Sequence, residues 1–123
     1  MKISVVGLGY VGLVTALCLA EKGHNVNCLD IDKEKIIQLN QGKFPFYEPG
    51  AEELFKKNAN RLRFTANYRE SLIENDVIMI CVGTPDNLDG SANLKFVYDA
   101  VEQIAQTVQH DCVVVIKSTV PVG

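Results

Sequence analysis

The sequence has no block of basic residues and no long apolar run, and both absences exclude classes of binding partner. Its 12 Lys and Arg are outnumbered by 15 Asp and Glu, which leaves a net charge of −3. Binding to nucleic acid or to an anionic membrane depends on an excess of positive charge, so neither partner is expected. No stretch is long and apolar enough to span a bilayer.

The sequence also lacks a pattern for metal binding or for nucleophilic catalysis. No two cysteines form a CxxC pair, and no histidine lies near a cysteine at metal-ligand spacing. Each cysteine falls in or directly beside a predicted helix or strand, as small buried thiols of a reducing cytosol do. The four are Cys18, Cys28, Cys81 and Cys112. His24 and His110 fall in predicted turns without a partner acid, so we expect both at the surface.

The N-terminus has some features of a secretory signal, because Lys2 is followed by apolar residues through Ala20. Three glycines at the spacing of a phosphate-binding turn interrupt this run. Removing the segment would also leave the strand before Asp30 without its partner. We therefore expect a cytoplasmic protein that retains the segment.

The most informative stretch lies in this same segment. An apolar strand at residues 3–6 leads into a GxGxxG turn at residues 7–12, which opens a helix over Tyr10–Glu21. A second strand, Asn25–Leu29, ends in Asp30. The acid lies near the roughly 20-residue offset of the dinucleotide-binding fingerprint. Strand, glycine turn, helix, strand and acid in this order predict a nucleotide-binding βαβ unit.

Each glycine of the turn has a physical role in that prediction. Gly7 allows the tight turn, Gly9 leaves room for a pyrophosphate at the backbone, and Gly12 lets helix and strand pack closely. The free N–H groups at the helix start, aided by the helix dipole, then bind the phosphates.

Asp30 indicates whether the cofactor is NAD or NADP. A carboxylate accepts hydrogen bonds from the adenosine ribose hydroxyls and repels a 2′-phosphate, which favours NAD over NADP. Lys33 and Lys35 lie close by and would soften this preference. A turn or cap residue is the alternative interpretation of Asp30.

The rest of the chain continues the alternation of strand and helix. Further strands are predicted at residues 61–65, 77–82 and 113–116, the first at an edge and the last two buried. Helices are predicted at residues 33–41, 49–58, 67–74 and about 97–108. The 123 residues thus predict an α/β domain with a doubly wound parallel sheet of the Rossmann type, about five strands in the order 3-2-1-4-5.

In such a sheet, ligands bind beyond the carboxyl ends of the strands, where the chain reverses direction. Thr84 and Thr119 follow the fourth and fifth strands. Their hydroxyls are candidates for contact with the cofactor or a reacting group, although strand-end threonines commonly serve only a turn.

Five motifs together resemble the UDP-glucose/GDP-mannose dehydrogenase family, and most of all its UDP-glucose 6-dehydrogenases. They run in the family's order over the whole chain: GLGYVGL at 7–13, YEPG at 47–50, VGTP at 82–85, DGSA at 89–92 and KSTVPVG at 117–123. The role of Glu48 in its motif stays open, and a helix-capping carboxylate is one interpretation.

The resemblance implies an oxidation of the C6 hydroxyl of UDP-glucose to the carboxylate of UDP-glucuronate, with two NAD used in succession. An aldehyde forms first, a cysteine captures it, and water hydrolyses the resulting thioester. The resemblance implies that Thr119 helps to hold this water, and that other residues bind NAD. The expected NAD-binding residues are the three glycines of the turn, Thr119, and six further residues: Tyr10, Val11, Asp30, Lys35, Thr84 and Ser118.

The chain differs from the family in length. The catalytic cysteine, lysine and aspartate, a glutamate, the central helix and the UDP-sugar domain of family members are expected outside residues 1–123. The chain is therefore expected to be a cofactor-domain fragment of an enzyme that forms a homodimer or larger homo-oligomer. GDP-mannose and UDP-N-acetylmannosamine 6-dehydrogenases remain alternatives, as does a small NAD-sensing module without catalysis.

Overall fold

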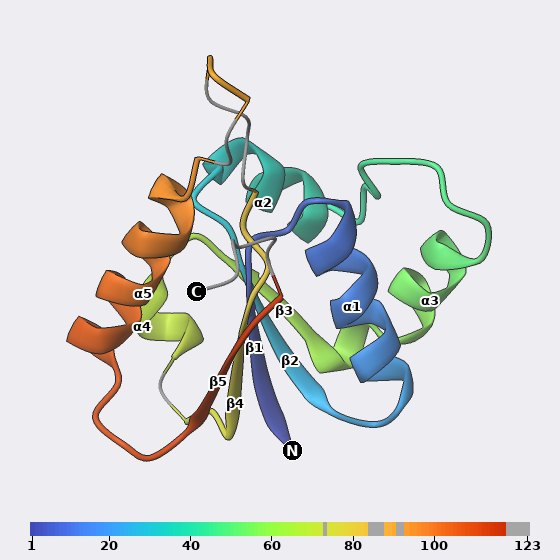
Figure 1. The fold of residues 1–123 in the computed structure, drawn as a ribbon. Coiled ribbons are helices and arrows are strands. Elements are labelled where there is room, and N and C mark those ends of the chain that lie inside the picture. The colour runs from blue at the N-terminus through green and yellow to red at the C-terminus, as the bar shows by residue number, and fades with distance from the viewer. Residues whose placement is uncertain (73, 84–87, 91–92, 118–123) are drawn as a thin grey trace.

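The computed structural model contains one parallel sheet with helices on both faces (Figure 1). It describes residues 1–72, 74–83, 88–90 and 93–117. The strand order is β3-β2-β1-β4-β5, which confirms the predicted order and fold class. The strands are β1 (Lys2–Val6), β2 (Asn25–Leu29), β3 (Leu62–Thr65), β4 (Val77–Ile80) and β5 (Val113–Ile116), and every pairing is parallel.

The side chains of β1 alternate between two cores, one on each face of the sheet. Val5 belongs to the core formed with α1, α2 and α3, and Val6 belongs to the core formed with α5 and the segment after α4. The helices are α1 (Tyr10–Glu21), α2 (Lys33–Asn40), α3 (Ala51–Lys57), α4 (Tyr68–Ser71) and α5 (Lys95–Thr107), with a 3-10 turn, η1 (Ala59–Arg61). None of these described helices is both long and apolar enough to cross a membrane.

Local signals in the sequence explain most helix ends. The Asp32 side chain accepts a hydrogen bond from the Lys35 N–H and caps α2, as predicted. Gly23 and Gly42 have φ values of +98° and +81° just beyond α1 and α2, which suits a glycine stop. The prediction for residues 67–74 was too long, because α4 covers only Tyr68–Ser71.

The prediction that the strand at 113–116 is buried was wrong. β5 lies at the edge of the sheet, and its four side chains are 38–60% exposed. None of them belongs to either core cluster. A continuous apolar run therefore predicted the strand correctly, but it did not predict what covers the strand.

Gly12 fixes the distance between α1 and the turn that precedes it. A Cβ atom at this position would lie 1.8 Å from the Gly7 carbonyl oxygen and 3.2 Å from the Cys81 Cβ. The first neighbour is backbone, so no rotamer change relieves the contact. The predicted role of Gly12 in close packing is thus visible as a steric limit.

We expect Gly12→Ala to lower the free energy of unfolding by about 2 kcal/mol or more, since overpacking outweighs the gain in helix propensity of about 1 kcal/mol. Urea denaturation followed by circular dichroism measures it. Gly83→Ala is the matched control, because a Cβ there has open space around it. A Gly12→Ala variant as stable as the parent would contradict the packing argument.

Candidate functional site

The site lies where β1, β2 and β4 end, around the glycine turn of residues 7–12. The Gly7 N–H donates to the Leu29 carbonyl oxygen at 2.8 Å, which holds the turn against the end of β2. Gly7 has φ +97°, and a Cβ atom there would lie 2.7 Å from the Val82 nitrogen. Both conditions require glycine, which supports the predicted role of Gly7 in the tight turn.

Gly9 is the N-cap of α1, and a Cβ atom built on it has nothing within 4 Å. The Leu13 N–H donates to the Gly9 carbonyl oxygen at 3.0 Å, so the preceding N–H groups of α1 have no acceptor inside the helix. These groups belong to Tyr10, Val11 and Gly12. Open space in front of free N–H groups, at the positive end of a 12-residue helix, is what a pyrophosphate requires.

Asp30 connects the end of β2 to the glycine turn. Its Oδ2 accepts a hydrogen bond from the Leu8 N–H at 2.8 Å, and its Oδ1 accepts one from the Asp32 N–H at 2.9 Å. The Lys35 Nζ lies 3.6 Å from Oδ2. The sequence predicted Asp30 near a ribose but missed this second role in holding the turn. Each carboxylate oxygen keeps a lone pair for a ligand hydroxyl.

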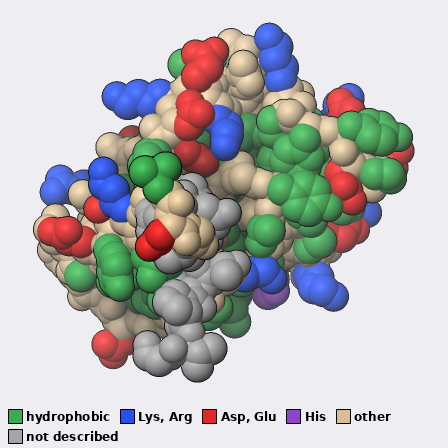
Figure 2. Space-filling model, turned by 45° about the horizontal axis from the view of Figure 1, so that its top comes forward, with side chains coloured by type: hydrophobic (Ala, Val, Ile, Leu, Met, Phe, Trp, Pro, Cys, Tyr) green, Lys and Arg blue, Asp and Glu red, His purple; other side chains and the backbone are tan. Residues whose placement is uncertain are grey.

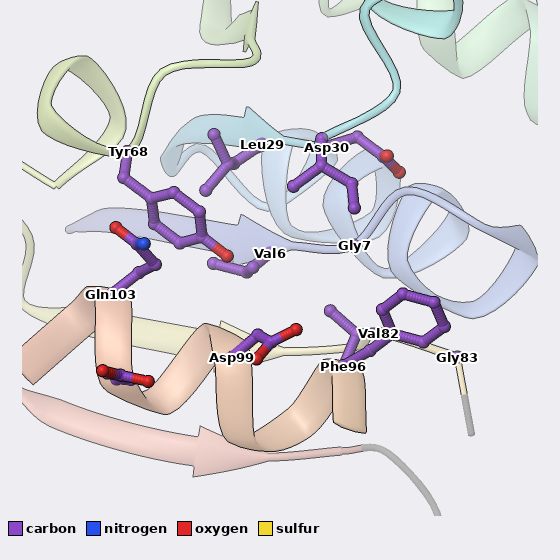
Figure 3. A pocket seen from close by; sticks show the side chains of 12 residues that line it. Val6, Gly7, Leu29, Asp30, Tyr68, Val82, Gly83, Phe96, Asp99 and Gln103 are labelled. Atoms are coloured by element: carbon purple, nitrogen blue, oxygen red, sulfur yellow. The ribbon is translucent and has the colours of Figure 1, made fainter. Parts of the chain in front are cut away.

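A cavity of about 400 Å³ opens beside Asp30, between the end of β2 and α5. Val6, Leu29 and Val82 contribute its apolar surface, and Tyr68 and Asp99 contribute polar groups (Figure 3). Among the described residues that line it, none is Lys or Arg. Its size and its partly apolar surface suit a flat ring rather than a phosphate.

The contribution of α5 to this cavity is not evident from the sequence alone. Phe96, Asp99 and Gln103 line it from one side of the helix. Their spacing of three and four residues was available in the sequence and places them on one helix face. What was missing was the knowledge that this face lies against the end of β2.

The loop between α2 and α3 packs against the first residue of α1. The Phe46 ring lies 5.3 Å from the Tyr10 ring and 4.8 Å from the Phe44 ring, between centroids. Phe44 in turn contacts Phe55 of α3 at 5.6 Å. Figure 2, which brings this end of the sheet forward, shows apolar side chains gathered on the side where α1 and α3 lie.

The same loop brings Glu48 to Tyr10. A hydrogen bond to the Glu48 carboxylate raises the pKa of Tyr10, and partial desolvation and the negative charge of Glu48 add to the shift. Glu48 does not cap α3 with its side chain, because the N-cap is Gly50 and the bond from the Ala51 N–H goes to the Glu48 backbone carbonyl. The structure thus gives Glu48 a partner that the sequence did not indicate.

Three of the predicted site residues, Thr84, Ser118 and Thr119, lie outside the described residues. The four cysteines are free, but the prediction that all are buried was wrong for Cys18, which is exposed, and Cys112 is partly buried. Burial raises the pKa of the Cys28 and Cys81 thiols, which disfavours the nucleophilic thiolate. Among the described side chains, no group of His, Cys, Asp and Glu is arranged to hold a metal ion.

Comparison with known proteins decides the family. The model of the UDP-glucose/GDP-mannose dehydrogenase family, NAD binding domain, matches residues 1–123. The chain belongs to this family. It is 52% identical over 125 residues to the UDP-glucose 6-dehydrogenase YwqF of Bacillus subtilis, covering 100% of this chain and 28% of that protein. The chain therefore spans less than a third of the length of this relative.

Solved structures of the family have the same fold. A ternary complex of GDP-mannose dehydrogenase from Pseudomonas aeruginosa matches with a TM-score of 0.92 and 38% identity. A UDP-glucose dehydrogenase from Pyrobaculum islandicum matches with a TM-score of 0.91 and 38% identity. Each match covers 98% of this chain and 29% of the other. The cofactor expected from the glycine turn and Asp30 is confirmed as NAD at the level of the family domain.

We expect Gly9→Val to abolish NAD binding and to keep the fold. The backbone of Gly9 is extended at φ −73°, so a branched residue fits, but its side chain would fill the space in front of the α1 N–H groups. Calorimetry should show no NAD binding, with unfolding free energy within about 1 kcal/mol of the parent. Gly9→Ala, with a smaller side chain, should bind with intermediate affinity. Unchanged NAD affinity in Gly9→Val would place the phosphates elsewhere.

We expect Glu48→Gln to lower the pKa of Tyr10 toward its ordinary value of 10.0. The carboxylate favours the protonated phenol as a hydrogen-bond acceptor and as a nearby negative charge, and glutamine removes the charge. Ultraviolet titration measures tyrosine ionisation, and the difference from the Tyr10→Phe variant isolates this residue. Coincident Tyr10 titrations in the parent and in Glu48→Gln would show that Glu48 does not act on the phenol.

Proposed function

We propose that this chain is the cofactor-binding part of an enzyme that oxidises the C6 hydroxyl of UDP-glucose to the carboxylate of UDP-glucuronate, with two NAD used in succession. The observation that carries the proposal is the hydrogen bond from the Leu8 N–H to the Asp30 Oδ2, at 2.8 Å. It joins the phosphate-binding turn to the acid that would bind the ribose, so one dinucleotide can contact both. The UDP-glucose 6-dehydrogenase relative at 52% identity supports the choice of substrate.

The described residues fit NAD as follows. The N–H groups of Tyr10, Val11 and Gly12 would donate to the pyrophosphate, and Asp30 would accept from the adenosine ribose hydroxyls. The adjoining cavity would receive the adenine. Bound NAD supplies the acceptor for the hydride removed from the sugar.

Further residues are proposed to complete the cofactor site. Lys35, whose Nζ lies 3.6 Å from the Asp30 carboxylate, is near enough to contact the ribose. Thr84 and Ser118 would touch the cofactor from the segments that follow β4 and β5. Thr119 would hold the water that hydrolyses the thioester, as the family resemblance implies.

The charges around the cavity favour NAD over NADP. Asp30, Asp99 and Glu102 line it, and no cationic side chain lines it within the part of the chain that the structure describes. A 2′-phosphate on the ribose would be brought close to these carboxylates. Among the described lysines, Lys35 pairs with one of them, Asp30. The balance of charge is therefore unfavourable for the phosphate.

The rest of the proposed enzyme would come from outside these 123 residues. The chain spans 28% of the Bacillus subtilis relative, and the sugar pocket and the catalytic cysteine, lysine and acids are proposed to lie in the remainder. A homodimer or larger homo-oligomer and a cytoplasmic location also stay predictions, and the four free cysteines suit a reducing compartment. GDP-mannose is the second candidate substrate, favoured by the 0.92 TM-score of that dehydrogenase.

We expect the purified chain to bind NAD at least roughly tenfold more tightly than NADP, because a nearby carboxylate disfavours the phosphate by more than about 1.4 kcal/mol. It should form no NADH from UDP-glucose, since hydride transfer needs a held substrate and a base. Calorimetry and NADH absorbance measure the two results.

The same assay on a longer chain that includes the proposed sugar pocket and catalytic residues is the positive control and separates the two substrates. Turnover of UDP-glucose in preference to GDP-mannose supports the proposed substrate, and the reverse preference contradicts it. NADH formation by the 123-residue chain alone would overturn the placement of the catalytic groups. Equal affinity for NAD and NADP would overturn the role of the carboxylates.

A further inference from the structure

Asp99 of α5 is a carboxylate of the cavity that the cofactor contacts proposed above do not use. Figure 3 shows its side chain directed from α5 toward the cavity, on the opposite side from Leu29 and Asp30. Within the described part of the chain, no hydrogen bond or ion pair to Asp99 is found. The Asp30 carboxylate, in contrast, accepts two backbone N–H groups. Asp99 therefore has its acceptor capacity available for a ligand.

The surroundings of Asp99 define the chemistry of that ligand. Val6, Leu29 and Phe96 give the cavity an apolar lining, which suits the faces of a flat heteroaromatic ring. Tyr68 adds a phenol to the lining, and burial followed by the charges of Asp99 and Asp30 raises the pKa of this phenol. An ionised carboxylate accepts hydrogen bonds and donates none. The ring that fits best therefore presents a donor, such as an exocyclic amino group, toward α5.

We propose that Asp99 determines the specificity for the base of the dinucleotide, accepting a hydrogen bond from the 6-amino group of adenine and disfavouring a 6-oxo purine. The proposal rests on the proposed function, which places adenine in this cavity. A 6-oxo group would direct a carbonyl oxygen at the carboxylate, so two acceptors would face each other without a proton between them. Asp99 is exposed in the unliganded chain, so the bound ring itself would have to cover the carboxylate. A covered carboxylate that faces a mismatched ligand edge is left without a donor, which weakens binding.

The residue Glu102 provides a matched control for charge. It lines the same cavity from the same helix, and its Oε1 already accepts a hydrogen bond from the Gln106 Nε2 at 3.4 Å. Glu102→Gln and Asp99→Asn each remove one negative charge without a large change in volume. Only Asp99→Asn should remove the preference for adenine over the 6-oxo base.

The test compares NAD with nicotinamide hypoxanthine dinucleotide, which differs in having a 6-oxo group in place of the 6-amino group. Calorimetry on the 123-residue chain measures both affinities. The parent should prefer NAD by about tenfold, the scale of one charged hydrogen bond. Asp99→Asn should bind the two within about twofold of each other, since an amide can turn either its NH₂ or its oxygen to the ring. Glu102→Gln should keep the preference of the parent.

Asp99→Ala is a second variant, which removes the acceptor and should also lose the preference; circular dichroism shows whether each variant is folded. Equal binding of both dinucleotides by the parent would overturn the role of Asp99 while leaving NAD binding intact. The role of Asp99 would also be overturned if both Asp99 variants kept the parent's ratio of the two affinities. It would likewise be overturned if Glu102→Gln lost this preference to the same extent as the Asp99 variants. Failure of the parent to bind either dinucleotide would overturn the proposed function itself, so the two failures are distinguishable.

Discussion

The site depends on one hydrogen bond, from the Leu8 N–H in the glycine turn to the Asp30 carboxylate at the end of β2. This bond and the bond from the Gly7 N–H to the Leu29 carbonyl oxygen hold the turn against the end of β2. The close packing of Gly12 against the Gly7 carbonyl then holds the start of α1 against the turn. A charged acceptor makes such a bond stronger than a neutral one. The free N–H groups of α1 and the carboxylate therefore keep a constant separation, which is what recognition of a phosphate and a ribose on one ligand requires.

The site also separates its charges. The start of α1 offers free N–H groups and the positive end of a dipole, whereas the cavity between β2 and α5 carries Asp30, Asp99 and Glu102. A dinucleotide has the complementary arrangement, with negative charge on its pyrophosphate and hydrogen-bond donors on its ribose and adenine. The order of charges along the site can therefore orient the ligand before close contacts form.

The sequence predicted the parts of the site that depend on neighbouring residues in the chain. Gly7, Gly9 and Gly12 act within one turn, and Asp30 follows the strand that pairs with β1, so their spacing carried the information. The contact of Glu48 with Tyr10 and the place of Asp99 depend on how separate helices and loops pack, which spacing does not encode. The exposure of β5 is a similar case, because apolarity predicts a strand but not its neighbours.

The position of β1 at the middle of the sheet has a consequence for synthesis on the ribosome. β1 pairs with β4, and the Lys2 N–H bonds to Asp76, 74 positions later. Gly7 packs against Val82, which follows β4, so the glycine turn has only its bonds to the end of β2 until β4 has been made. The motif nearest the N-terminus is thus completed late, and a nascent chain should first gain cofactor affinity only after β4 leaves the exit tunnel.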